Sequence, residues 1–355
     1  MLQGFSTFTI MNSKQPILEC VPNFSEGRDE KKINAIADAI RSVKGSHLLH
    51  IDTSPSANRT VMTFAGAPEA VTEAAYIGIK KAAEVIDMSE HAGVHPRIGA
   101  TDVCPLVPLA GLNIEDTNKW ANILGKRVGA ELQIPVYLYE YSALKDHRRA
   151  LPDIRKGQYE GFAEKIKLPD WLPDYGPAIF NMQTGATVIG ARNILVAFNI
   201  SLNTRDVDKA IYIAEHIRER GYIVEENGKR RKLPGLLSKV RAIGWYMEDY
   251  ETAQVSMNLL DYRVSSPLKV WETCNALAAE VNTSLLGCEV IGLIPLECMV
   301  EAGAYAYLKE QEEVPKDEEM IVHTGIDYLG FRNVKSFEAR EKILEYALTD
   351  AGLLE

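Results

Sequence analysis

The sequence runs twice through one order of six secondary-structure elements, and this repeat restricts the fold more than any other feature. In each half, β-branched and apolar runs alternate with segments of helical periodicity in the order strand, helix, strand, strand, helix, strand. The segments are residues 17–21, 29–43, 47–51, 59–65, 68–86 and 101–107, and then 193–200, 206–221, 240–247, 253–261, 267–281 and 288–294. This order is typical of the split βαβ unit. The sequence therefore predicts an α/β (α+β) fold with two ferredoxin-like subdomains.

The segments outside the repeat set the predicted domain boundaries. We expect an N-terminal extension over residues 1–16, an N-terminal subdomain over 17–185 and a C-terminal subdomain over 186–308. Residues 309–355 begin with the charge-rich run KEQEEVPKDEE, which predicts a charged linker followed by a terminal helix near 337–348.

Composition and charge limit the function classes. The 355 residues are 46% hydrophobic and 25% charged, as in globular proteins, and the net charge of −10 argues against nucleic acid as a partner. No run of about 18 apolar residues predicts a membrane span. The five cysteines form no CxxC pair, and the N-terminus lacks the pattern of a secretory signal, so we expect a cytoplasmic protein with reduced thiols.

The predicted topology gathers polar residues at one edge of the first sheet. Right-handed crossovers make the first two strands parallel and the other two antiparallel to them. The segment after strand one, the turn after strand two and the loop before strand four therefore share an edge. They contain Asn23, Glu26, Asp52, Asn58, Arg59, His91, His95 and Arg97. The helix that begins at Asp29 points its positive end toward this edge, which suits a carboxylate ligand.

Two histidines at this edge suggest different chemistry. His91 and His95 have the i, i+4 spacing of some zinc sites, but Gly93 and Pro96 oppose a helix, so we expect no metal. His95, with Asp52 and Arg97 at the same predicted edge, instead suits acid–base catalysis.

Two further segments leave alternatives open. The stretch GPAIFNMQTGATVIGAR (176–192) is rich in glycine. This is equally compatible with an ordinary loop and with a backbone that closely approaches a flat heteroaromatic ligand. The basic run within 228–241 predicts a solvated loop, or a contact for a polyanionic tail.

Several motifs in one order resemble the glutamate formimidoyltransferase (formiminotransferase) family. They are VPNFSEGRD, IDTSPSANRTVMTFAG, DMSEHAGVHPRIGATDVCP, IPVYLYEYSA, DYGPAIFNMQTGATVIGAR and LVAFNISLNT, and the resemblance extends from about Ile17 to Leu308. It implies transfer of a formimidoyl group from N-formimidoyl-L-glutamate to N5 of tetrahydrofolate. It also implies a homodimer and two subdomains whose sheets face each other across a substrate tunnel, with the helices outside.

The resemblance also implies roles for particular residues. The family's GxHPR motif carries its proton donor, which here is His95. The family's folate-binding segment corresponds to Gly176, Pro177, Ala178, Ile179, Phe180, Asn181, Met182, Gln183, Thr184 and Gly185. Thr184 stands where bifunctional relatives have a tryptophan. Those relatives continue into a cyclodeaminase domain, so the stand-alone form is expected here.

The chemistry of the transfer suggests roles for the other edge residues. A histidine with a pKa near 6.5 can accept a proton from the attacking nitrogen and return it to the leaving nitrogen. We expect Asp52 to orient His95, and Arg59 or Arg97 to clamp a glutamate carboxylate. Asn23, Glu26 and Asn58 are expected to hold the amidine and amino nitrogens. Tetrahydrofolate, with a polyglutamate tail or without, is the expected cosubstrate, and neither a metal nor a redox cofactor is needed.

Three alternatives stay open from the sequence. A formyl donor is nearly isosteric with a formimidoyl donor, so a glutamate formyltransferase or another enzyme that handles 5-formyltetrahydrofolate fits the same residues. A folate-binding protein without catalytic activity is the second alternative. A metal-dependent amidohydrolase that uses His91 and His95 is the third.

Overall fold

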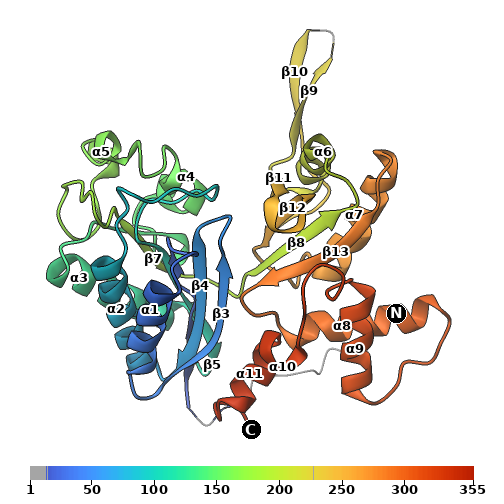
Figure 1. Ribbon diagram of the computed structural model, residues 1–355, viewed down its shortest axis with the longest axis horizontal. Coiled ribbons are helices and arrows are strands. Elements are labelled where there is room, and N and C mark those ends of the chain that lie inside the picture. The colour runs from blue at the N-terminus through green and yellow to red at the C-terminus, as the bar shows by residue number, and fades with distance from the viewer. Residues whose placement is uncertain (1–12, 14, 227) are drawn as a thin grey trace. The chain divides into compact units, whose positions relative to one another are not determined.

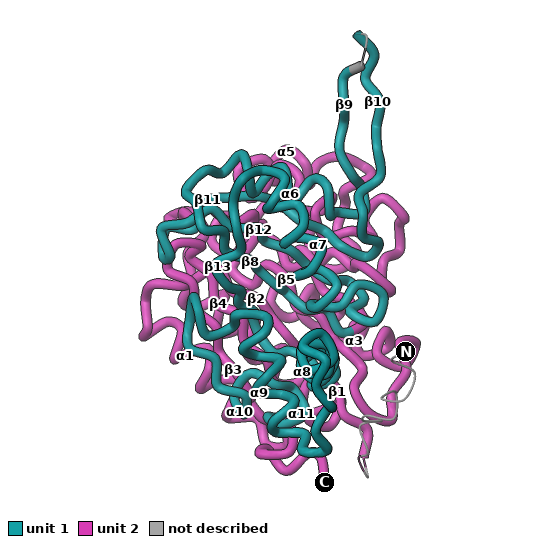
Figure 2. Tube along the Cα trace, turned by 90° about the vertical axis from the view of Figure 1, so that its right-hand side faces the viewer, with its two compact units in different colours: residues 1–9, 194–347 teal, residues 10–193, 348–355 magenta. Residues whose placement is uncertain are grey.

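The computed structural model describes residues 13, 15–226 and 228–355, and the chain forms two compact units (Figures 1 and 2). The N-terminal unit extends to Asn193 and includes Leu348–Glu355, and the C-terminal unit comprises Ile194–Ala347. The predicted extension over residues 1–16 falls largely outside the described residues. Among the described helices, none has the length and apolar character that a membrane span requires.

The N-terminal unit contains the predicted ferredoxin-like arrangement. Its elements are β1 (Ile17–Cys20), β2 (Asn23–Phe24), α1 (Glu30–Arg41), β3 (Ser46–Ser54), β4 (Arg59–Gly66), α2 (Pro68–Val85) and β5 (Thr101–Ala110). β1 and β2 lie end to end between β4 and β5 and pair antiparallel with both, and β3 pairs with the outer edge of β4. The predicted element order and strand directions are confirmed.

Local sequence explains the helices of this unit. Asp29 caps α1 by accepting from the backbone N–H groups of Lys31 and Lys32. Ile33, Ile36 and Ile40 are buried along one face of α1, as their helical spacing predicts. α2 begins at Pro68, where a missing N–H costs least.

Further elements extend the N-terminal sheet beyond the predicted unit. These are α3 (Ile114–Glu131), β6 (Val136–Leu138) and β7 (Thr187–Ala191), with short α4 (Leu151–Arg155), α5 (Phe162–Lys165) and 3-10 turns η1 (Glu140–Ser142), η2 (Asp146–Arg148) and η3 (Pro169–Trp171) between them. β7 pairs parallel with β5, and β6 pairs parallel with β7. The expected boundary at 185/186 therefore precedes a strand of the N-terminal sheet, and the compact unit continues to Asn193.

The C-terminal unit repeats the arrangement with a four-stranded sheet. Its elements are β8 (Val196–Leu202), α6 (Val207–Ile217), β11 (Val240–Met247), η4 (Glu248–Tyr250), β12 (Thr252–Leu259), α7 (Pro267–Glu280) and β13 (Leu285–Ile291). The strand order is β11-β12-β8-β13 and all pairs are antiparallel. The second half therefore has the same topology as the first.

Two predictions for the C-terminal unit need correction. The basic run predicted as a loop lies in a hairpin of β9 (Tyr222–Glu226) and β10 (Lys229–Leu233), which projects from the unit in Figure 1. The charged stretch after Lys309 is only partly a linker. It leads from α8 (Leu296–Lys309) to α9 (Glu318–Tyr328), which buries Ile321, Val322 and Ile326, and then to α10 (Ala339–Lys342) and α11 (Leu344–Asp350).

Candidate active site

Three loops meet at one edge of the N-terminal sheet, as the topology predicts, and Asn58 joins them. Its Oδ1 accepts from the N–H of Gly27 at 2.9 Å, and its Nδ2 donates to the carbonyl of Ala92 at 3.0 Å. Asn58 has a φ of 48°, a conformation that asparagine adopts more readily than most residues. Both ends of its amide bind protein backbone, so Asn58 holds the edge together.

A glycine lets the loop of the GxHPR motif lie directly on this turn. A Cβ at Gly93 would stand 2.4 Å from the carbonyl oxygen of Ala57. Any larger residue would push the loop away from the turn. This steric restriction explains why the motif has glycine at this position.

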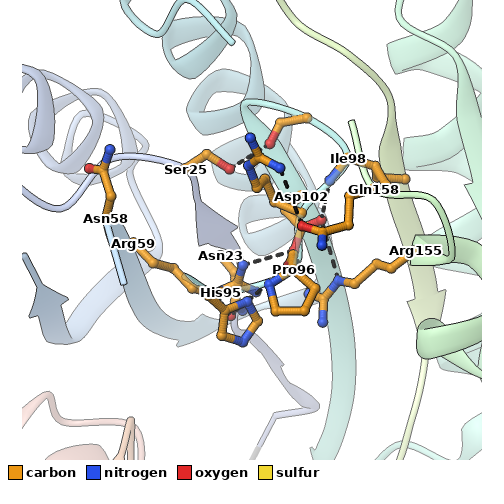
Figure 3. Close-up of polar contacts among 12 residues, drawn as sticks. Asn23, Ser25, Asn58, Arg59, His95, Pro96, Ile98, Asp102, Arg155 and Gln158 are labelled. Atoms are coloured by element: carbon orange, nitrogen blue, oxygen red, sulfur yellow. Dashed lines mark hydrogen bonds and ion pairs between the residues drawn. The ribbon is translucent and has the colours of Figure 1, made fainter. Parts of the chain in front are cut away.

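A buried carboxylate, Asp102, organises the centre of the edge (Figure 3). Its side chain is fully buried near the start of β5. Oδ2 forms ion pairs with Arg59 Nη1, at 2.9 Å, and with Arg155 Nη2, while Oδ1 accepts from the N–H of Ile98 at 3.0 Å. Burial alone raises the pKa of Asp102, but the charges of Arg155 and Arg59 outweigh it and lower the pKa to about 2. Two guanidinium groups and one carboxylate leave a net positive charge, which suits an anionic ligand.

Asn23 fixes the second side of Arg59. Its Oδ1 accepts from Nε of Arg59 at 3.0 Å and from Nη2 at 2.7 Å, and its Nδ2 donates to the carbonyl of Val21 at 2.9 Å. Burial lowers the pKa of Arg59 to about 10 although Asp102 opposes this shift, so Arg59 remains a cation at neutral pH. Asn23 and Arg59 are therefore brought together as predicted, with the asparagine supporting the arginine.

His95 lies half-buried beside this group. Its Nδ1 is 2.8 Å from the carbonyl oxygen of Pro96, and because a carbonyl only accepts, Nδ1 carries the proton. Among the described residues, Nε2 has no hydrogen-bond partner. Burial and the charges of Arg59 and Arg155 hold the pKa of His95 well below its usual value, although Asp102 opposes this. At neutral pH the imidazole is neutral, with the lone pair of Nε2 ready to accept a proton.

The expected pairing of Asp52 with His95 needs correction. Asp52 lies on β3, and its Oδ2 is 3.1 Å from Nε2 of His50. The carbonyl of Pro96 holds the His95 ring instead, and the carboxylate whose charge acts on His95 is Asp102. The sequence could not separate the two aspartates, because both belong to strands that end at this edge.

His91 and Arg97 are bound to each other and to neighbouring loops. Nδ1 of His91 accepts from Nε of Arg97 at 3.1 Å, and Nε2 donates to the carbonyl of Asn58 at 2.9 Å. The two Nη atoms of Arg97 bind the carboxylate of Glu160 at 2.9 and 2.6 Å. The guanidinium fork of Arg97 therefore already holds a carboxylate of the protein itself.

Glu26 occupies the N-terminal end of α1. Its Oε1 accepts from the N–H groups of Arg28 and Asp29 at 2.9 and 3.0 Å, and Lys32 Nζ lies 3.6 Å from Oε2. The N–H groups at the positive end of the helix are therefore bound by the carboxylates of Glu26 and Asp29, and a ligand carboxylate at this end stays a prediction.

The segment 176–185 has a fixed backbone and exposed apolar side chains. The carbonyl of Gln183 accepts from the N–H of Met88 at 2.8 Å, and its side chain donates to the carbonyl of Ala83 at 3.1 Å. Ile179 and Met182 are 70% and 65% exposed. A loop that is hydrogen-bonded to its neighbours and presents apolar side chains is suited to contact with a flat ligand.

Tyr159 connects this segment to the loop that carries His95. Its hydroxyl donates to the carbonyl of Met182, its N–H donates to the carbonyl of Arg97 at 2.9 Å, and its ring packs 5.3 Å from that of Phe180. The segment and the histidine loop are therefore neighbours within one unit.

Sequence reasoning missed Asp102 and Arg155. Asp102 is the second residue of the apolar strand β5, and a polar residue at that position was the available signal. Arg155 lies at the end of α4, inside a stretch without clear periodicity. No group of three or more His, Cys, Asp or Glu side chains suited to a metal ion occurs among the described residues.

The chain matches two family models. Residues 17–192 match the formiminotransferase domain, N-terminal subdomain, and residues 197–349 match the formiminotransferase domain.

Curated relatives give the same result. The chain is 43% identical to formimidoyltransferase-cyclodeaminase of Mus musculus, over 95% of this chain and 60% of that protein. It is 38% identical to glutamate formimidoyltransferase of Streptococcus pyogenes, over 83% of this chain and 94% of that protein. It is 40% identical to the protein of the same name from Thermoplasma acidophilum, over 81% and 91%. The chain thus spans about 60% of the bifunctional relatives and nearly all of the shorter ones.

Proposed function

This chain belongs to the formiminotransferase family, and from that premise we propose that it transfers the formimidoyl group of N-formimidoyl-L-glutamate to N5 of tetrahydrofolate. The products are L-glutamate and 5-formimidoyltetrahydrofolate, a reaction that belongs to histidine degradation. The observation that carries the proposal is the neutral imidazole of His95, whose Nδ1–H donates to the carbonyl of Pro96 beside the Arg59–Asp102–Arg155 group.

His95 can move the single proton that the transfer requires. N5 of tetrahydrofolate attacks the formimidoyl carbon of the protonated amidine. As the new C–N bond forms, the π pair of the C=N bond moves onto the imino nitrogen, and Nε2 of His95 accepts the proton that N5 loses. The tetrahedral intermediate then breaks its bond to the glutamate nitrogen, which takes the proton back from His95. A neutral histidine suits the first step, and the same group acts as the acid in the second.

Arg59 and Arg155 are suited to bind a carboxylate of the glutamyl donor. Asp102 neutralises only one of their two charges, and it holds both guanidinium groups in place. Preorganised cations of this kind attract an anion without the cost of ordering long side chains. Asn23 and Asn58 then have supporting roles, since their amides already bind Arg59 and the backbone.

Tetrahydrofolate is the proposed cosubstrate, and residues 176–185 are its proposed contact. Their exposed Ile179 and Met182 side chains support this role. Group transfer between two nitrogens changes no oxidation state, so the reaction needs no redox cofactor. We further propose a homodimer in the cytoplasm. The five cysteines are buried and unpaired, which is compatible with a reducing compartment.

The decisive experiment compares donors. The purified protein is incubated with tetrahydrofolate and either N-formimidoyl-L-glutamate or N-formyl-L-glutamate, and the folate product is identified by mass spectrometry. Preferred formation of 5-formimidoyltetrahydrofolate supports the proposal. Preferred formation of 5-formyltetrahydrofolate replaces it with the formyl transfer, and folate binding without either product leaves a binding protein.

A further inference from the structure

A group of polar side chains occupies one face of the C-terminal sheet. Along β8, Phe198 and Ile200 belong to the hydrophobic core, while Asn199 and Ser201 alternate with them and point to the opposite face. Strand pairing sets Glu289 of β13 opposite Asn199, and Gln254 of β12 opposite Ser201. The centre of this face is therefore polar.

Glu289 is the hydrogen-bond acceptor at the centre of the group. Its Oε1 accepts from Nδ2 of Asn199 at 3.2 Å and from Nε2 of Gln254 at 3.0 Å, and its Oε2 accepts from the hydroxyl of Tyr250 at 2.7 Å. The residue is only 7% exposed. All three donors are neutral, and among the described residues Glu289 has no ion-pair partner.

The orientation of these donors is itself fixed. Oε1 of Gln254 accepts from the indole N–H of Trp245 at 2.8 Å, which leaves the Gln254 amide N–H groups for Glu289 and for Ser201, at 3.3 Å. A carboxylate held in this way without a cation is costly to bury, and an apolar residue at the centre of a sheet face costs less. Such a group is best explained by a ligand that supplies further N–H donors.

The group also selects the shape of that ligand. A carboxylate accepts about four hydrogen bonds, and three are already made within the protein, so acceptor capacity remains on Oε2. The half-buried rings of Trp245 and Tyr250 belong to the same network and provide flat surfaces. A planar group with N–H donors meets both conditions.

We propose that Glu289 is a binding residue for a planar N–C–N unit that carries N–H groups. The identity of the ligand rests on the proposed function, which supplies two sources of this chemistry. One is the amidine of the formimidoyl donor, and the other is the 2-amino-4-oxopyrimidine part of the reduced pteridine. Each is planar and carries N–H groups, and one of these N–H groups can donate to the acceptor position that remains on Oε2 of Glu289.

The test measures dissociation constants of the E289Q variant by isothermal titration calorimetry, with tetrahydropterin and with N-formimidoyl-L-glutamate as separate probes. L-Glutamate is the control ligand, because it lacks the N–C–N unit. We expect E289Q to bind one of the two probes at least ~10-fold more weakly and L-glutamate unchanged. Weaker binding of tetrahydropterin identifies the pteridine as the source, and weaker binding of the donor identifies the amidine. Unchanged binding of both probes by a variant with the wild-type melting temperature overturns the inference.

Two further variants keep the test decisive. Glu251 is an exposed glutamate that directly follows η4, the 3-10 turn that contains Tyr250. The control variant E251Q should bind every probe as the wild type does. If E289Q does not fold, E289D is measured instead. This variant keeps the negative charge, but its side chain is shorter by one methylene group. Wild-type affinity of E289D for both probes also overturns the inference. Wild-type turnover with tetrahydrofolate is measured in parallel. Absent turnover contradicts the proposed function, whereas normal turnover with unaltered affinities in the variants contradicts only the role of Glu289.

Discussion

Arg59 and Asp102 form a buried ion pair across the central strand of the N-terminal sheet, with 2.9 Å between Nη1 and Oδ2. Arg59 begins β4 and Asp102 lies near the start of β5, and β2 runs between these two strands. Asn23 of β2 accepts two hydrogen bonds from Arg59. The split βαβ topology therefore brings these residues together. It places the start of β4 and the start of β5, which are distant in sequence, on either side of β2.

Replacing Asp102 by Asn should reduce kcat/KM by ~10²-fold or more, because Arg59 and Arg155 lose the negative charge that they share. Removing the one charge that balances these two arginines should also lower the free energy of unfolding by on the order of 3 kcal/mol, although Arg59 keeps its hydrogen bonds to Asn23. Steady-state kinetics and urea unfolding measure the two effects. Because Asp102 raises the pKa of His95, the variant should also shift the acidic limb of the pH–rate profile to lower pH. Wild-type kinetics in D102N would show that the carboxylate has no positioning role.

Replacing His95 by Gln should lower kcat by ~10²-fold or more and leave folate binding intact, since the residue is needed for proton transfer only. The wild-type profile provides a second test. The active form is the neutral imidazole, and the pKa of His95 lies well below 6.5, so kcat/KM should stay constant as the pH falls from 8 to 6.5 and decrease only below that. An acidic limb centred at 6.5 or above would contradict the environment described for His95.

The two guanidinium roles can be separated by mutation. Arg155→Ala should raise the KM for the donor by ~10-fold or more, because a cation that faces the site is lost. Arg97→Ala should act mainly on stability, since Arg97 binds Glu160 and His91. Donor KM and melting temperature are measured for both variants. An equal rise in KM would return Arg97 to substrate binding.

The pattern of the sequence predicts the fold more completely than the site. Apolar periodicity and right-handed crossovers predict both six-element units and the shared edge of the first, because these rules depend only on residue type and order. They do not predict which carboxylate meets which cation there. Asp52 and Asp102 both lie on strands that reach this edge, and their partners depend on side-chain directions that periodicity does not contain. Arg155 comes from an irregular stretch, where no repeat indicates its position.

The basic hairpin allows a prediction about long-chain folates. Lys229, Arg230, Arg231 and Lys232 are exposed on β10. Replacing all four by Ser should raise the KM for triglutamyl tetrahydrofolate several-fold at low ionic strength and leave the KM for the monoglutamate unchanged, because only the longer tail carries several charges. The difference should disappear in 0.5 M salt. If both KM values stay unchanged, the hairpin has no role in binding the tail.

The last prediction concerns stability and Glu345 of α11. This side chain is 8% exposed and its Oε2 accepts from the N–H of Leu296 at 2.7 Å. Burial raises the pKa of Glu345 to about 7, so the folded state favours the protonated acid. A raised folded-state pKa contributes stability that is complete below the unfolded value near 4.5 and is lost as the pH rises through 7. Because Gln resembles the neutral acid, E345Q should raise the melting temperature by a few degrees at pH 8 and leave it nearly unchanged at pH 4.5. Differential scanning calorimetry at the two pH values measures this, with the exposed Glu313→Gln as a control that should change neither. An equal effect of E345Q at both pH values would show that packing, and not ionisation, sets its stability.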